Sequence, residues 1–298
     1  MMKSASTLID TVPTPKQKQV KSTVFSRLRK NNIAFAAFLF IIALHLLVFI
    51  GPLIWRVSPE ALTTHGALTG WSLQTPMGTD EIGRDVLARI LHGGRVTLLV
   101  GLTSMLFSVF LGVVVGACAG FFNKVVESIL MRITEAMMAI PNFFFVLVAL
   151  TVLGTSPVMV VIVIAVSSWM EIARVVYGET LKWKQYEFVE AANAAGASPL
   201  RILIRYVIPQ IYPSIIVAGT LCIAWAILTE SAISYLGLGI QPPTPTWGNM
   251  LQNAQQYIWT APILGILPGV AITLIVLAYN FLGDGLRDAL DPKVVRKK

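Results

Sequence analysis

The chain has 298 residues, of which 55% are hydrophobic and only 13% are charged, and its mean hydropathy is +0.73. Soluble domains carry about 25% charged residues, so this composition excludes an ordinary soluble protein and indicates an integral membrane protein. The net charge of +8 does not indicate nucleic-acid binding, because much of the basic excess lies before the first apolar run and after the last one.

The apolar runs predict an all-α membrane protein with six transmembrane helices, since a span requires about 20 predominantly apolar residues. The runs lie at 33–54, 97–122, 136–153, 158–170 with an extension to 176, 211–228 and 263–282. Lys and Arg near span ends mark the cytoplasmic side, so both basic tails are expected in the cytoplasm. Their charge also suits contact with anionic membrane lipid.

The external segment at 55–96 is expected to contain a short amphipathic helix lying at the membrane surface. Thr79 can cap this helix, Asp80 and Glu81 suit its first turn, and Asp85 and Arg89 can form an i,i+4 ion pair. A solvated connecting helix is the alternative.

The second span carries a small residue at every fourth position: Ser104, Ser108, Gly112, Gly116 and Gly120. Small residues at this spacing allow helix backbones to approach closely. The stripe predicts tight packing inside a helical bundle and gives no information about a solute.

The stretch at 187–198 is too polar to span a membrane and too poor in large side chains to form a core. Glu187 and Glu190 fall in the first turn of a short helix, and Gly196 suits the left-handed conformation that ends one. A helix this short is marginal alone, so its flat alanine surface must pack on the ends of its own spans or on a separate protein. A second helix is expected to follow and to end at Pro209.

Four segments together resemble the permeases of binding-protein-dependent ABC importers. Glu190-Ala191-Ala192 with Gly196 and Pro209 resembles their EAA loop, and the other three segments are GTDEIGRDVLARILHGGRVTLLVG at 78–101, SYLGLGIQPPTPTWGNML at 234–251 and LGDGLRDALDP at 282–292. The similarity covers most of the chain beyond the N-terminal tail. It is closest to the C-type subunit of the dipeptide, oligopeptide and nickel permease group. The chain departs from the EAA pattern at Tyr206 and Ile208, which both keep an apolar body.

This resemblance implies a type I ABC importer permease fold in a bacterial-type cytoplasmic (inner) membrane. The implied organisation is a cytoplasmic tail at 1–32, a first span at 33–54, the external segment at 55–96, a permease core at 97–286 and a basic cytoplasmic tail at 287–298. The EAA loop would be a coupling helix seated in a cytoplasmic ATPase, formed by Glu187, Glu190, Ala191, Ala192, Gly196, Ala197 and Pro209.

The resemblance further implies four partner subunits: a homologous permease, two ATP-binding cassette ATPases and an external solute-binding protein. ATP and Mg²⁺ would bind to the ATPases, because this chain has no G-x-x-x-x-G-K-[ST] motif. No cofactor or metal is expected on this chain, and it is not expected to be an enzyme.

Two further features are candidate sites near the external side. Glu230, at the end of the fifth span, could face the translocation path, since ionisable groups in membranes are often functional. A carboxylate hydrogen-bonded to the 231–234 region is the alternative. Pro242, Pro243 and Trp247 could dock the binding protein or gate the outer mouth, unless this loop is only a rigid connector.

The leading interpretation is therefore a permease subunit of an ATP-driven importer for di- or oligopeptides. Import of nickel or a metallophore is the alternative within the same family. A passive channel and a membrane-embedded hydrolase are the alternatives from other classes. The few intramembrane acids and three scattered histidines disfavour the hydrolase.

Overall fold

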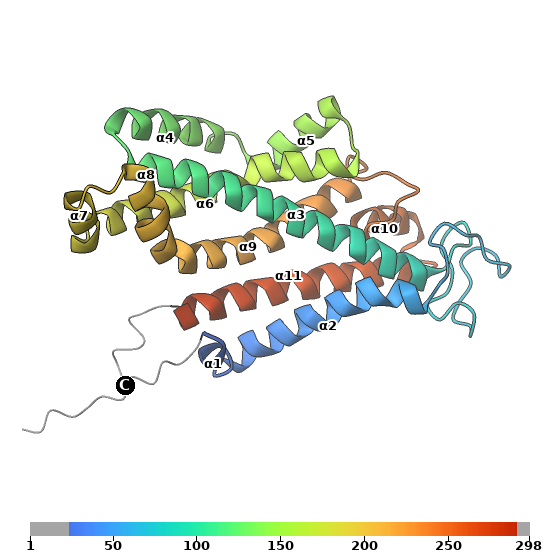
Figure 1. The fold of residues 1–298 in the computed structure, drawn as a ribbon. Helices are drawn as coiled ribbons and strands as arrows, with labels where there is room; N and C mark the ends of the chain where they lie inside the picture. Colours follow the sequence, from blue (N-terminus) through green and yellow to red (C-terminus); the bar gives the residue numbers. More distant parts are fainter. Residues whose placement is uncertain (1–23, 291–298) are drawn as a thin grey trace, which may run out of the picture.

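The computed structural model describes residues 24–290; the rest of both basic tails lies outside the described residues. The fold is all-α (Figure 1). The elements are α1 Val24–Leu28, α2 Asn32–Ile54, α3 Val86–Phe121, α4 Lys124–Met138, α5 Asn142–Leu153, α6 Pro157–Lys184, α7 Glu187–Ala194, α8 Pro199–Ile202, a π-helical segment Leu203–Val207, α9 Ile208–Tyr235, α10 Trp247–Ala254, a 3₁₀ turn Gln255–Tyr257 and α11 Ile263–Leu290.

The predicted spans are confirmed, with the third one divided. Within residues 24–290, five helical runs are long and apolar enough to cross a membrane: α2, α3, α6, the run Pro199–Tyr235 and α11. The run predicted at 136–153 falls in the pair α4 and α5, which is bent by 85° and would make a sixth span if the pair crosses the membrane as one unit. Pro141 precedes α5 at this bend, and its ring nitrogen cannot donate the hydrogen bond that would continue α4.

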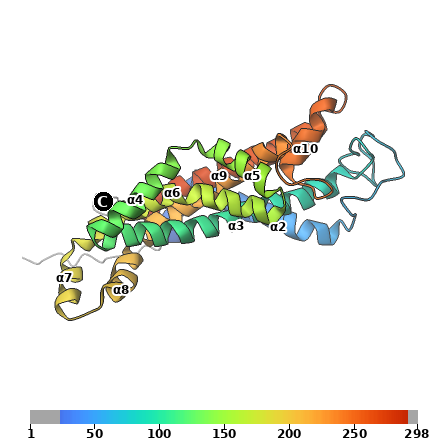
Figure 2. The ribbon, with the colours of Figure 1, turned by 90° about the horizontal axis from the view of Figure 1, so that it is seen from above.

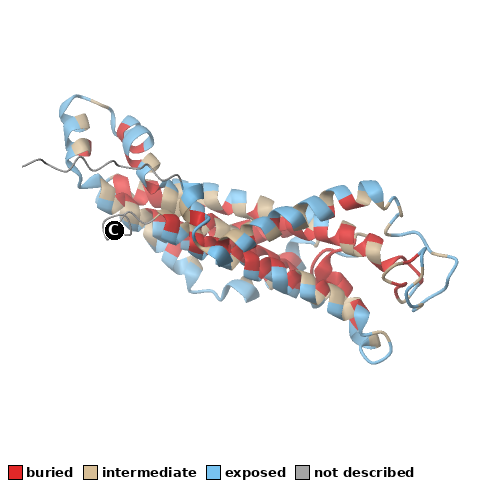
Figure 3. Ribbon diagram, turned by 90° about the horizontal axis from the view of Figure 1, so that it is seen from below, coloured by how far each residue is buried: buried red, intermediate tan, exposed pale blue. Residues whose placement is uncertain are grey.

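The two ends of the described chain lie at the same end of the bundle. Arg27 Nη1 donates a hydrogen bond to the carbonyl of Ala289 at 3.1 Å. Figure 1 shows α7 at this end too, whereas the segment between α2 and α3 and helix α10 lie at the opposite end. We call these the α7 end and the α10 end. Buried residues follow the bundle axis between them, and α7 and α8 project beyond it (Figure 3).

The prediction of a separate surface helix at 78–95 is wrong. Residues 78–85 form turns, and α3 begins at Val86 with Asp85 as its cap: the Asp85 Oδ1 accepts from the Ala88 N–H at 2.7 Å. The predicted cap, Thr79, instead accepts from the Thr69 N–H. Val86 is buried in a cluster with α10 and α11, and this packing makes the predicted helix the first turns of the spanning helix.

The predicted Asp85–Arg89 ion pair is also wrong. Arg89 Nε lies 3.3 Å from Asp80 Oδ2, which also accepts from Arg84 Nε at 2.6 Å. Asp85 is occupied as the helix cap. The external segment is thus organised around one buried carboxylate that faces two buried guanidinium groups.

The small-residue stripe of α3 faces α6, the helix on which α3 packs most extensively. A Cβ added at Gly112 would lie 2.7 Å from Cβ of Ile172, and one at Gly120 would lie 2.7 Å from Cβ of Thr180. Gly116 faces the α6 backbone in the same way. The two helix backbones therefore lie closer than a side chain at any of these three glycines would permit.

Pro209 does not end the helix that starts after Gly196, contrary to the prediction. α8 continues through the π-helical segment into α9, and Pro209 lies in the first turn of α9. The N–H of Ile208 bonds to the carbonyl of Leu203, five residues earlier. A π turn accommodates the proline, which lacks the N–H of a regular helix bond. Continuous helix therefore joins α8 to the membrane-spanning α9.

Candidate functional site

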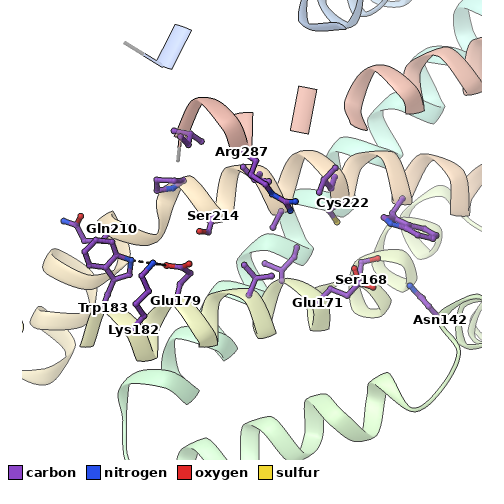
Figure 4. A pocket seen from close by; sticks show the side chains of 18 residues that line it. Asn142, Ser168, Glu171, Glu179, Lys182, Trp183, Gln210, Ser214, Cys222 and Arg287 are labelled. Carbon is purple, nitrogen blue, oxygen red and sulfur yellow. Dashed lines mark hydrogen bonds and ion pairs between the residues drawn. The ribbon is translucent and has the colours of Figure 1, made fainter. Parts of the chain in front are cut away.

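A groove of about 830 Å³ opens between α6, α9, the start of α5 and the last turns of α11 (Figure 4). Apolar side chains of α9 form much of its floor. The polar and charged lining residues are Asn142, Ser168, Glu171, Glu179, Lys182, Gln210, Ser214 and Arg287. The groove thus brings together polar groups from four helices that are distant in sequence.

Glu171 lies in the middle of α6. It is 14 residues from Pro157 and 13 from Lys184, or about 20 Å from either end at 1.5 Å per residue. Arg174, three residues further along α6, donates to Met138 Sδ at 3.9 Å. Within residues 24–290, Glu171 has no ion pair or hydrogen bond, and its exposed side chain lines the groove.

Arg287 lies in the last turn of α11. The sequence predicted this residue only in the basic C-terminal tail. Its exposed guanidinium lines the same groove and has no ion-pair partner in the described part of the chain. Figure 4 shows it above α9, between Ser214 and Cys222, on the other side of the groove from Glu171. No local pattern could reveal this meeting, because it depends on how α6 and α11 pack on α9.

The two charged side chains nearer the α7 end of the groove, Glu179 and Lys182, form an ion pair with each other. Lys182 Nζ lies 3.2 Å from Glu179 Oε2, and Trp183 Nε1 donates to the same oxygen at 3.2 Å (Figure 4). These groups fix the last turns of α6. They leave Glu171 and Arg287 as the unpaired charges lining the groove among the described residues.

The segment implied to be a coupling helix forms a compact projection at the α7 end (Figure 2). Gly196 has φ +78°, and the N–H groups of Gly196 and Ala197 bond to the carbonyls of Asn193 and Ala192. This is the Schellman arrangement that ends a helix. Glycine adopts the left-handed conformation without the steric cost that a side chain would add.

The implied coupling residues differ in exposure. Glu187, Glu190, Ala191 and Gly196 are exposed, whereas Ala192, Ala197 and Pro209 are half-buried. Val189 is buried and anchors α7 on a cluster formed with side chains of α3, α6 and the helical run from α8 to α9. α7 therefore keeps one face against its own chain and presents the acidic and small residues outward.

An aromatic cluster joins α7 to α6. The rings of Trp183 and Tyr186 stack with their centroids 4.6 Å apart, and Phe188 contacts both. Such contacts add to the stability that apolar burial gives. The projection is thus attached to α6 by this cluster and to α9 by continuous helix.

Glu230 is fully buried near the α10 end and does not line the groove. Ser234 Oγ donates to its Oε1 at 2.8 Å, and the hydroxyls of Thr97 and Ser231 lie 3.4 Å from its Oε2. Thr97 Oγ1 also accepts from the Trp247 N–H at 3.2 Å. This geometry fits the hydrogen-bonded alternative and links α3, α9 and the start of α10.

In the proline-rich outer loop the two candidate prolines are exposed and the tryptophan is buried. Pro242 and Pro243 are exposed, but Trp247 is only 1% exposed and its Nε1 donates to the Ile90 carbonyl at 3.0 Å. The indole packs on Gly94 of α3. It can therefore act on a partner only by positioning the loop.

The fold is that of a type I ABC importer permease. A chain in a solved structure described as inward-facing conformations of the MetNI methionine ABC transporter aligns with a TM-score of 0.56 at 18% identity. The alignment covers 68% of this chain and 97% of that chain, and a second crystal form gives a TM-score of 0.57. This likeness shows the fold.

Sequence comparisons specify the family. The model described as binding-protein-dependent transport system inner membrane component matches residues 108–296, and that of the N-terminal TM domain of oligopeptide transport permease C matches residues 22–76. The chain belongs to this family of inner-membrane permeases. Relatives include the glutathione transport system permease protein GsiD of Pectobacterium atrosepticum, 36% identical over 96% of this chain and 97% of the relative. The same-named protein of Escherichia coli O157:H7 is 37% identical over 96% of both chains.

Proposed function

We propose that this chain is the permease subunit of an ATP-driven importer for short peptides, including glutathione. The observation that carries the proposal is the identity of 36–37% over nearly the whole chain to permeases described as glutathione transport proteins. Nickel or metallophore import is the second candidate within the family. No group of three or more His, Cys, Asp or Glu in residues 24–290 could hold a metal ion, but a chelated metal would not require one.

The groove is the proposed wall of the translocation path. Several of its lining side chains are exposed at the surface of this chain, so one chain alone would not enclose a solute. A homologous permease facing the groove would close it. An external binding protein would deliver the solute at the α10 end.

ATP-driven motion would enter at the α7 end. We propose that α7, with its exposed face from Glu187 to Gly196, sits in a groove of a cytoplasmic ATPase, and that two such ATPases bind ATP and Mg²⁺. Both ends of this chain would then be cytoplasmic. The aromatic cluster and the continuous α8–α9 helix give α7 the rigid attachment that transmission requires.

Reconstitution of the complete importer in proteoliposomes tests the proposed function. The assembly would contain this permease, its homologous permease, both ATPases and the binding protein. We expect uptake of labelled glutathione or a dipeptide that requires ATP and the binding protein. Uptake of ⁶³Ni²⁺ without peptide uptake would select the nickel alternative, and uptake without ATP would indicate a passive channel.

Gly196 provides the test of coupling. We expect Gly196→Val to abolish ATP-dependent uptake while the protein remains in the membrane, because a β-branched residue at φ +78° is strained and distorts the end of α7. Gly196→Asn is the matched control, since asparagine tolerates this conformation better than other non-glycine residues. Normal uptake by the valine variant would contradict the coupling role.

A further inference from the structure

Glu171 occupies a position at which a carboxylate is costly unless it serves a function. Glu171 lies about 20 Å from either end of α6, a helix long enough to cross a bilayer whose hydrocarbon core is about 30 Å thick. Ionisable groups within spanning helices face a bundle interior or an aqueous cavity and mark solute or ion pathways. Glu171 faces the groove and has no partner within the described chain.

Arg287 supplies the opposite charge on another wall. Glu171 and Arg287 both line the groove, from α6 and α11, while α9 between them contributes Ser214 and Cys222 (Figure 4). An acid and a base on separate walls, with hydrogen-bonding groups between them, complement a solute that carries both an ammonium and a carboxylate. The groove volume of about 830 Å³ falls within the usual range for small-molecule sites, about 300–1,000 Å³.

We propose that Glu171 and Arg287 form a solute-binding site within the path, in which Glu171 binds the ammonium group of a peptide and Arg287 binds its carboxylate. This inference rests on the proposed peptide-import function and deepens it. The site holds a passing zwitterion between two charges of this chain, so that neither charge of the solute is removed from water without a partner. Arginine suits the carboxylate because its planar guanidinium can form two parallel hydrogen bonds.

The test uses the complete importer in proteoliposomes with labelled glutathione and a zwitterionic dipeptide. The variants are Glu171→Gln, Glu171→Asp and Arg287→Gln. Two controls remove charges on the same helices that do not line the groove: Arg174→Gln on α6 and Asp284→Asn on α11. The readouts are solutes imported per ATP hydrolysed and co-purification of the homologous permease.

We expect Glu171→Gln and Arg287→Gln each to lower the number of solutes imported per ATP about tenfold, as for the loss of one charge-assisted contact of about 1.4 kcal/mol. Glu171→Asp should restore much of the loss, and the two controls should match the unmodified chain. Co-purification of the homologous permease should not change.

Three outcomes separate the possible failures. Unchanged import per ATP in both neutral variants would overturn this inference and leave the proposed function intact. Loss of the homologous permease from either variant would assign the charges to subunit assembly and overturn the inference as well. Absence of ATP-dependent peptide uptake by the unmodified importer would instead overturn the proposed function on which the inference rests.

Discussion

One buried carboxylate, Asp80, organises the segment between α2 and α3. Asp80 accepts from the guanidinium groups of Arg84 and Arg89, which are 7% and 2% exposed. Its Oδ1 also accepts from two backbone N–H groups of its own turn. A buried ion pair adds little net stability, but removing one partner leaves uncompensated buried charge. Asp80 therefore holds the turns at 78–85 to Arg89 in the first turns of α3.

We expect Asp80→Ala to destabilise the permease by about 3–5 kcal/mol, because it leaves two buried guanidinium groups without their main partner. Thermal unfolding in detergent, followed by the fraction that remains monodisperse, measures the change. The control is Arg132→Ala, which removes an exposed ion pair with Glu135 and should change stability by less than about 1 kcal/mol. Equal effects of the two substitutions would contradict this account of Asp80.

A second buried carboxylate, Glu230, gives a residue-scale prediction that separates its two possible roles. Glu230→Ala leaves the hydroxyl groups of Thr97 and Ser234 without their acceptor and should cost about 1–3 kcal/mol of stability. Glu230→Gln keeps an acceptor oxygen and should retain uptake and most of the stability. Loss of uptake by a stable Glu230→Gln variant would instead indicate that the carboxylate itself faces the path.

At the scale of elements, the α3–α6 pair is the central packing unit. Small residues of α3 let the two backbones approach, and Ser108 Oγ donates to the Ala165 carbonyl of α6 at 3.1 Å. In a bilayer, close van der Waals packing and interhelical hydrogen bonds drive helix association. Since α6 carries Glu171 and leads into α7, this pair also connects the groove to the proposed coupling surface.

We expect Gly112→Val to reduce the free energy of unfolding by about 1–3 kcal/mol and to lower the yield of folded protein. The reason is that the valine side chain would overlap Ile172. Gly178→Ala in α6 is the control: a Cβ there meets no atom within 4 Å, and alanine favours the helix by up to about 1 kcal/mol. Thermal unfolding of both variants in the same detergent measures the difference. A neutral Gly112→Val would show that the helices separate without cost.

At the scale of the whole molecule, the two ends of the bundle differ in structure. The α10 end holds the external segment, the buried Trp247 and the exposed proline loop. The α7 end holds both ends of the described chain and the rigid projection. Under the proposed function, the α10 end receives the solute from outside the cell and the α7 end receives the motion from the ATPases.

The orientation is testable by cysteine labelling in a background without Cys118 and Cys222. We expect Leu73→Cys, at a side chain 80% exposed at the α10 end, to react with a membrane-impermeant maleimide in intact spheroplasts. Ala195→Cys, at the exposed end of α7, should react only after permeabilisation. The reverse pattern would invert the membrane orientation and contradict the proposed sites of ATPase and binding-protein docking.

The amino-acid sequence by itself determined the features that depend on local free energies. Apolar runs partition into a bilayer residue by residue, so the spans could be located without knowing their neighbours. Gly196 was identified as a helix end for a similar reason, because the left-handed conformation is a property of one residue. The family resemblance, carried by contiguous motifs, was equally readable.

Only the tertiary structure decided which groups meet. The start of α3 depends on Val86 packing against α10 and α11, and the partner of Arg89 depends on how the external turns fold. Glu171 and Arg287 are more than a hundred positions apart, and no periodicity links them. Their common groove exists because α6 and α11 both pack on α9, and such contacts between distant segments are set by the shapes of whole helix surfaces and not by any local preference.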